Sequence, residues 1–298
     1  MNALALPPDF EGRILRDEPM AKHTSWHVGG PADVFFTPRD VSDAAGFLRS
    51  LAPETTVMWI GLGSNLLVRD GGIRGVVIDT QGVFAELERV NDTDVRCGSG
   101  VPCAKLAKQC VKWGLGAAEF LAGIPGTLGG ALAMNAGAFG GETWRHVRSV
   151  TTLDRAGAVR ERPASDYEVG YRHVRGPREE WFLGAHLRFE PRPDVSNEDI
   201  RLLLARRKAT QPIGAWSCGS VFTNPHGDHA ARLIDTAGLK GTCIGGAQVS
   251  PMHANFIIND GSARASDIEA LIAHVQQTVE RVHGVKLVPE VRMVGEKA

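Results

Sequence analysis

The segment Trp59-Ile-Gly-Leu-Gly-Ser-Asn-Leu-Leu-Val68 places the first constraint on the fold. It has the pattern of a short buried strand, a turn of small residues and a second apolar run. Backbone N–H groups released in such a turn can form a nest for an anion. A Rossmann fingerprint needs Gly or Ala at position 66 so that a helix can close on the strand, but Leu66 stands there. The segment therefore indicates either a phosphate-binding loop outside the Rossmann fold or a tight structural turn.

A second glycine-rich segment lies farther along the chain. It reads Ala122-Gly-Ile-Pro-Gly-Thr-Leu-Gly-Gly-Ala-Leu-Ala-Met-Asn-Ala-Gly-Ala-Phe-Gly-Gly141. Its glycines allow a ligand to approach the backbone closely, and a helix that begins at or just after Thr127 would direct its N-terminus at a phosphate. Either loop alone is also consistent with a structural turn, but two such loops in one domain favour phosphate binding.

The composition carries the same glycine signal and excludes several classes of protein. Glycine accounts for 35 of 298 residues, and 17 of these lie between Gly61 and Gly141, without the three-residue period of collagen. The segment from Phe120 to Gly141 carries no charge, but Pro125 and its glycines exclude a membrane-spanning helix. The formal net charge of −1 offers no global field for nucleic acid or for an anionic membrane.

Other motifs narrow the chemistry by their absence from the sequence. The five cysteines form no Cys-x-x-Cys pair, and their odd number argues against a disulfide framework. P-loop, His-Glu-x-x-His and Gly-x-Ser-x-Gly motifs are missing, and the scattered histidines predict no metal site. The N-terminal residues lack the pattern of a secretory signal, so we expect a cytoplasmic protein.

The hydrophobic periodicity predicts alternating helices and strands, with a boundary near residues 191–199 between two domains. A capping box, Ser266-Asp-Ile-Glu269, predicts the start of a long helix whose apolar stripe is Ile268, Leu271, Ile272, Val275, Val279 and Val282. Other helices are expected over residues 40–51, 102–113, 197–209 and 229–237. Strands are expected over residues 57–60, 75–79, 95–99, 150–154, 158–161, 181–189, 220–223, 256–259 and 285–294.

Taken in order, the motifs of the chain resemble those of the UDP-N-acetylenolpyruvoylglucosamine reductase family from about Thr24 to Gly295. One such tetrapeptide would be weak evidence, but the ordered set is highly specific. In the first part the motifs are Val28-Gly-Gly-Pro-Ala32, Gly61-Leu-Gly-Ser-Asn-Leu-Leu67, Ala122-Gly-Ile-Pro-Gly126, Met134-Asn-Ala-Gly137 and Gly170-Tyr-Arg172; in the second they are Cys218-Gly-Ser-Val-Phe222, Gly238-Leu-Lys-Gly241, His253-Ala-Asn-Phe256 and Pro289-Glu-Val-Arg292.

The resemblance implies an α+β fold with an FAD-binding domain of the vanillyl-alcohol-oxidase-like type. That domain would cover residues 20–192 in two subdomains split near residue 80, and an α+β substrate-binding domain would cover residues 198–296. The implied activity is that of an NADPH-dependent flavoenzyme of peptidoglycan precursor synthesis, in the cytoplasm, which reduces UDP-N-acetylglucosamine enolpyruvate with non-covalently bound FAD. The implied partner is this small UDP-sugar, with no nucleic acid or membrane.

The same resemblance implies a set of cofactor-binding residues in the two glycine loops. They would hold the FAD pyrophosphate and its flanks. The first loop supplies Gly61, Leu62, Gly63, Ser64, Asn65 and Leu66, and the second supplies Gly123, Ile124, Pro125, Gly126, Gly129, Asn135, Ala136 and Gly137.

Three residues are the implied catalytic set. Arg172 offers a permanently charged fork suited to a carboxylate, although a surface salt bridge is an alternative. Ser220 would donate a proton to the carbanion left by hydride transfer, and Glu290 would stabilise the enolate. By residue type alone, a turn serine and a partly exposed strand carboxylate are the better interpretations of these two positions, and only the resemblance favours the catalytic roles.

Substrate contacts are implied at four further positions, and two features depart from the family pattern. Lys208 and Asn224 would bind the diphosphate or the sugar, although a solvated helix end and a turn residue are the alternatives; His253 and Asn255 complete the set. Thr223 and Met252 stand where family members often carry a basic residue. The two tyrosines, Tyr167 and Tyr171, both lie near Arg172, which indicates a shorter branch without a tyrosine-bearing substrate loop.

Overall fold

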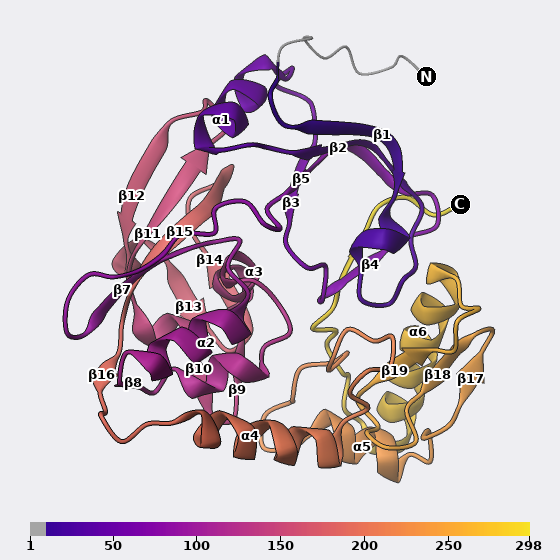
Figure 1. The fold of residues 1–298 in the computed structure, drawn as a ribbon. Helices are drawn as coiled ribbons and strands as arrows, with labels where there is room; N and C mark the ends of the chain where they lie inside the picture. Colours follow the sequence, from indigo (N-terminus) through magenta and orange to yellow (C-terminus); the bar gives the residue numbers. More distant parts are fainter. Residues whose placement is uncertain (1–9) are drawn as a thin grey trace. The chain divides into compact units, whose positions relative to one another are not determined.

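The computed structural model describes residues 10–298, which divide into two compact units (Figure 1). One unit comprises residues 10–15, 34–62 and 75–206, and the other comprises 16–33, 63–74 and 207–298. The sequence-based division assigned residues 20–33 and 63–74 to the FAD-binding part and ended that part before residue 198. Each unit is therefore built from three separate stretches of the chain, which the sequence pattern does not reveal.

The first unit is built around an antiparallel sheet with the strand order β12-β11-β15-β7-β6. One face is polar: Arg96, His186 and Ser149 occupy one register row across β7, β15 and β11. The opposite face is buried, and the apolar sides of α2 and α3 share its core. The elements are β6 (Leu87–Arg89), β7 (Asp94–Gly98), β11 (Val147–Asp154), β12 (Val159–Pro163), β15 (Glu180–Arg188), α2 (Cys103–Lys112) and α3 (Leu128–Met134).

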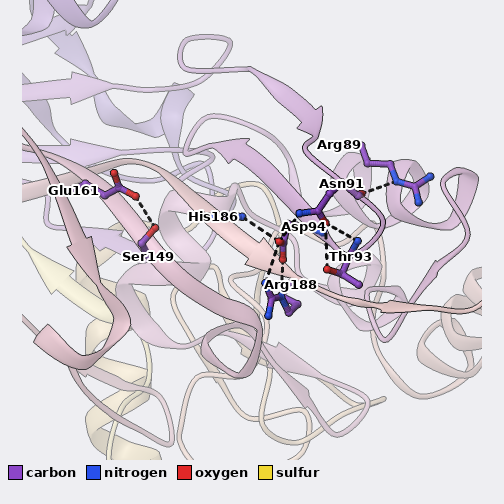
Figure 2. Close-up of polar contacts among 8 residues, drawn as sticks. All are labelled: Arg89, Asn91, Thr93, Asp94, Ser149, Glu161, His186 and Arg188. Atoms are coloured by element: carbon purple, nitrogen blue, oxygen red, sulfur yellow. Dashed lines mark hydrogen bonds and ion pairs between the residues drawn. The ribbon is translucent and has the colours of Figure 1, made fainter.

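A charged cluster joins the strands β7 and β15 at one end of this sheet (Figure 2). Asp94 is 4% exposed and accepts hydrogen bonds from Arg188 Nε at 2.6 Å and Nη2 at 3.0 Å. Asn91 Nδ2 donates to the same carboxylate at 2.8 Å. The hydrogen bond from Arg188, with that from Asn91, holds the pKa of Asp94 well below its ordinary value.

A second sheet has the strand order β1-β2-β5-β3, and β3 runs parallel to β5. The helix α1 (Val41–Ser50) begins after Asp40, whose side chain accepts a hydrogen bond from Asp43 N at 2.9 Å. The buried residues of α1 include Phe47, which stacks on Phe36 with ring centroids 4.0 Å apart. The strands are β1 (Arg13–Pro19), β2 (Pro31–Thr37), β3 (Val57–Ile60) and β5 (Ile73–Asp79).

The second unit packs helices α5 (Ala230–Thr236) and α6 (Ala265–His283) around a small antiparallel sheet, β17-β18-β19. A separate parallel pair joins β4 (Leu66–Val68) to β20 (Arg292–Val294). The predicted stripe of α6 is buried except at its last member, Val282, which is 47% exposed. The strands of the small sheet are β17 (Cys243–Ile244), β18 (Ala247–Val249) and β19 (Ile257–Asn259).

The remaining elements of the two units are short, apart from the helix α4 (Asn197–Thr210). The strands are β8 (Leu115–Gly116), β9 (Gly137–Ala138), β10 (Gly141–Glu142), β13 (Glu168–Gly170), β14 (His173–Arg175) and β16 (Glu190–Pro191). The 3-10 turns lie at Met20–His23, Glu119–Gly123, Thr143–His146 and Ala164–Asp166.

Three expectations about local structure are wrong. The predicted strand at 220–223 is an irregular segment in which Phe222 forms an isolated bridge to Pro289. The predicted strand at 285–294 is reduced to β20, because Pro289 has no N–H for a ladder and Glu290 N turns to Val221 O instead. Helix α6 begins after Arg264 rather than at Ser266, since the carboxylate of Asp70 accepts hydrogen bonds from Ala265 N and Ser266 N, each at 3.0 Å.

The uncharged segment at 120–141 forms the end of a 3-10 turn, then α3, β9 and the start of β10. Across residues 10–298, no helix is both long enough and apolar enough to cross a lipid bilayer.

Candidate active site

The two predicted glycine loops meet inside the first unit. A Cβ atom on Gly61 would collide with the side chain of Thr127, so only glycine allows this approach. Thr127 is 2% exposed and is the N-cap residue of α3, as the sequence predicts for the start of that helix. The first loop then passes into the second unit, where its residues from Gly63 onward belong.

Two buried hydroxyl groups lie where these loops meet the sheet. Neither Ser99 Oγ nor Thr127 Oγ1 has a hydrogen-bond partner among the described residues, and Ser99 is only 1% exposed. Gly129 N donates to Ser99 O at 2.8 Å, which fixes the second loop against Ser99. Buried polar groups are nearly always hydrogen-bonded, so two unsatisfied hydroxyls on segments that the Gly129–Ser99 hydrogen bond joins fit a bound polar ligand. Sequence reasoning missed Ser99, although a small polar residue between a strand and Gly100 was a usable signal.

The rest of the second loop is closely packed against neighbouring residues. Gly123 is buried, and a Cβ atom there would lie 2.5 Å from the ring of Phe139. Ala136 O accepts hydrogen bonds from Thr143 N at 3.0 Å and Oγ1 at 2.7 Å. Of the other predicted cofactor residues here, Ile124 is buried, Gly126 and Gly129 are half-buried, and Pro125 is exposed.

Arg172 lies at the tip of the β13–β14 hairpin and reaches the end of the second loop. Its Nη2 donates to Gly137 O at 2.9 Å, and its Nη1 donates to Asn135 O at 3.3 Å. The backbone of Arg172 is left-handed, with φ +55°. Such a conformation is uncommon for a non-glycine residue, and here it lies at the turn of a hairpin.

In the second unit, Ser220 and Glu290 lie on neighbouring chain segments. Val221, which follows Ser220, accepts a hydrogen bond at its carbonyl oxygen from Glu290 N at 2.8 Å. Cys218 is buried in the core of this unit, and burial, followed by the charge of Glu290, raises the pKa of its thiol well above the ordinary value. The structure thus brings together two of the three predicted catalytic residues within one unit, and Arg172 belongs to the other unit.

The predicted substrate residues occupy different settings. The amide of Asn255 makes two hydrogen bonds with the backbone of Phe222, accepting from its N at 3.0 Å and donating to its O at 2.8 Å. Asn224 Oδ1 accepts from Ala230 N at the start of α5, and Lys208 is an exposed residue of α4. His253 is half-buried, and burial lowers its pKa. Asn255 therefore braces the Ser220 segment, whereas the side chain of Lys208 is accessible to a ligand.

Comparison with known proteins identifies the family. The chain is 57% identical over 286 residues to the UDP-N-acetylenolpyruvoylglucosamine reductase of Alkalilimnicola ehrlichii, and the match covers 96% of both chains. The chain belongs to the UDP-N-acetylenolpyruvoylglucosamine reductase family. The reductase of Methylococcus capsulatus is 56% identical over 96% of this chain and 94% of its own length.

The family models and a solved structure agree with this membership. Residues 32–162 match the FAD binding domain, and residues 211–294 match the C-terminal domain of UDP-N-acetylenolpyruvoylglucosamine reductase. The crystal structure of the family member from Thermus caldophilus superposes with a TM-score of 0.80 at 30% identity, covering 96% of this chain and 99% of that one. The chain is therefore an FAD-dependent oxidoreductase, and the predicted family and fold class are confirmed.

Proposed function

We propose that this reductase converts UDP-N-acetylglucosamine enolpyruvate to UDP-N-acetylmuramate in peptidoglycan precursor synthesis, with NADPH as the hydride donor. The match to reductases of this family over nearly the whole chain is the observation that carries the proposal. The predicted cytoplasmic location is part of the same proposal, because a UDP-sugar and a nicotinamide donor are cytoplasmic metabolites.

The two glycine loops would hold FAD without a covalent bond. The hydroxyls of Ser99 and Thr127 supply hydrogen bonds that the protein itself leaves unused among the described residues. Four of the predicted FAD-binding residues lie in the same unit as Ser99 and Thr127, which is consistent with one cofactor site: Gly61, Leu62, Gly123 and Gly126. When bound, the flavin supplies the hydride chemistry, and the protein supplies binding and orientation.

Arg172 would bind the carboxylate of the enolpyruvyl group. A guanidinium can form two parallel hydrogen bonds to a carboxylate, and its charge offsets the negative charge that develops when a hydride adds to the double bond. Its guanidinium lies at the end of the second glycine loop, which supports this role, because that loop would hold the cofactor.

Ser220 would hold the proton that completes the reaction. Hydride addition to the terminal carbon leaves an electron pair on the carbon that bears the carboxylate, and the Ser220 Oγ proton is then transferred to that carbon. Glu290, fixed against Val221 by its backbone N–H, would stabilise the enolate form of the intermediate. Lys208, Asn224 and His253 would contact the nucleotide or the sugar, while Asn255 would keep the Ser220 segment in place.

An anaerobic colour test distinguishes this function from its alternatives. The purified protein should be yellow, NADPH should bleach it, and UDP-N-acetylglucosamine enolpyruvate should restore the colour without oxygen. Restoration by oxygen alone would indicate an oxidase. A colourless protein that still binds the UDP-sugar would indicate a nucleotide-sugar sensor, and either result would contradict the proposal.

A further inference from the structure

Asn135 occupies a conformation and a position that a simple loop residue does not require. It ends α3 with a left-handed backbone, φ 48° and ψ 53°, and it is 2% exposed. Asparagine is one of the few non-glycine residues that adopt this conformation readily. Its buried amide must therefore be satisfied by the protein around it.

The side chain of Asn135 ties three segments together. Its Oδ1 accepts a hydrogen bond from Trp144 N at 3.1 Å. Its Nδ2 donates to Gly170 O at 3.0 Å and lies 3.4 Å from Glu142 Oε2. Gly170 is the last residue of β13, opposite His173, so the amide of Asn135 holds the hairpin directly beside its two-residue tip.

The backbone of the same residue holds the guanidinium at that tip. Arg172 Nη1 donates to Asn135 O, and Nη2 donates to Gly137 O. Asn135 therefore contacts both the base of the tip, through Gly170, and the charged end of Arg172. A residue that holds both the hairpin beside Arg172 and the guanidinium itself can fix the direction of this side chain more closely than packing alone.

We propose that Asn135 is a positioning residue that aims Arg172, and that its effect on catalysis is exerted through Arg172. The inference rests on the role of Arg172 in the proposed function. It differs from the prediction that Asn135 binds FAD, because the amide is already engaged by Trp144 and Gly170. The two roles have different kinetic consequences, which makes them separable.

The test is a double-mutant cycle on the full-length, FAD-loaded enzyme. Asn135→Gly removes the amide but keeps a residue that adopts the left-handed backbone and retains the carbonyl group. It is combined with Arg172→Ala, and Asn91→Gly, at the exposed β6–β7 turn, is the matched control. The measurements are FAD per chain, the rate of flavin bleaching by NADPH, and kcat and KM for UDP-N-acetylglucosamine enolpyruvate.

We expect Asn135→Gly to lower kcat/KM for the enolpyruvyl substrate by about 10–100-fold, as a misdirected reacting group does. FAD content and the rate of bleaching by NADPH should stay at the wild-type and Asn91→Gly levels. In the Arg172→Ala background, Asn135→Gly should lower kcat/KM by less than about twofold, because the guanidinium that Asn135 positions is already absent. If Asn135→Gly does not fold, Asn135→Asp, which replaces the Nδ2 donor by an acceptor, takes its place in the cycle.

Three results would overturn the inference. Losses that multiply in the double variant would show that Asn135 acts independently of Arg172. A loss of FAD with normal kinetics in the loaded fraction would assign Asn135 to the cofactor. If Arg172→Ala is slow but Asn135→Gly is fully active, Asn135 does not position Arg172, and the proposed role of Arg172 stands. If Arg172→Ala is itself fully active, the proposed role of Arg172 is contradicted.

Discussion

The side-chain amide of Asn65 donates a hydrogen bond to the carbonyl oxygen of Glu290, with Nδ2 and O 3.1 Å apart although 225 positions separate the two residues. Arg292 N donates to Asn65 O at 3.0 Å, and the parallel pair of β4 and β20 begins there. The end of the first glycine loop and the proposed catalytic Glu290 are therefore parts of one hydrogen-bonded frame. A substitution at Asn65 should therefore alter the position of the Glu290 backbone.

Asn65→Ala should lower kcat by about 2–10-fold, which is the rate equivalent of one net hydrogen bond. The expected cause is a looser backbone at Glu290, so FAD content should change little. Steady-state kinetics with absorbance-based FAD quantification would measure both quantities. A variant with normal kcat and much reduced FAD would show instead that Asn65 serves the cofactor.

Thr127→Val should weaken FAD binding by about tenfold, because it removes a hydroxyl that has no hydrogen-bond partner among the described residues while keeping its shape. Thr278→Val, a matched change at a buried threonine of α6, should leave FAD affinity unaltered. Titration of the apoprotein with FAD gives the two dissociation constants. Equal affinities in the two variants would remove Thr127 from the cofactor site.

Asp94→Asn should destabilise the first unit by about 1–3 kcal/mol, because it breaks the paired hydrogen bonds from Arg188 (Figure 2). The side chain of Arg188 is 47% exposed and can be solvated after the change, which keeps the loss below that of a fully buried pair. Asp92→Asn is the control, since the side chain of Asp92 is 99% exposed. Thermal unfolding should show a lower Tm for Asp94→Asn and a wild-type Tm for Asp92→Asn; equal Tm values would contradict the assignment.

The stabilisation from Asp94 should also depend on pH in one direction. The pKa of this carboxyl is lowered in the folded protein, so its contribution is complete above the unfolded pKa of about 3.9 and is lost as pH falls toward the folded value. The difference in Tm between wild type and Asp94→Asn should hold from pH 7 to about pH 5 and shrink below pH 4. A difference that grows on acidification would refute this linkage.

Elements with local signals were predictable from the sequence, and those set by distant partners were not. The strand β3 and the helices α1 and α2 follow apolar periodicity and end at local stop signals, and their predicted bounds agree within a residue or so. The start of α6 is shifted because Asp70, 195 positions earlier, caps it. No local pattern reports such a contact.

The same distinction holds for the candidate site. Ordered motifs were enough to predict the family, but they did not reveal that the amide of Asn255 is hydrogen-bonded to Phe222 or that the amide of Asn135 is hydrogen-bonded to Gly170.

The high glycine content of the chain is explained only in part by ligand binding. Several of these glycines, Gly72 against Pro31 and Gly98 against Phe84 among them, are required where two backbones pack closely.

Anaerobic reoxidation of the NADPH-reduced enzyme by UDP-N-acetylglucosamine enolpyruvate, followed by stopped-flow absorbance, tests the central claim most directly. Wild type, Ser220→Ala and the neighbouring control Ser217→Ala should all bind FAD and be bleached by NADPH at similar rates. Ser220→Ala alone should regain its colour about 10²–10⁴-fold more slowly, because it lacks the proton donor. Reoxidation of Ser220→Ala at the wild-type rate would contradict the assigned role, and the absence of substrate-driven reoxidation in wild type would contradict the proposed function.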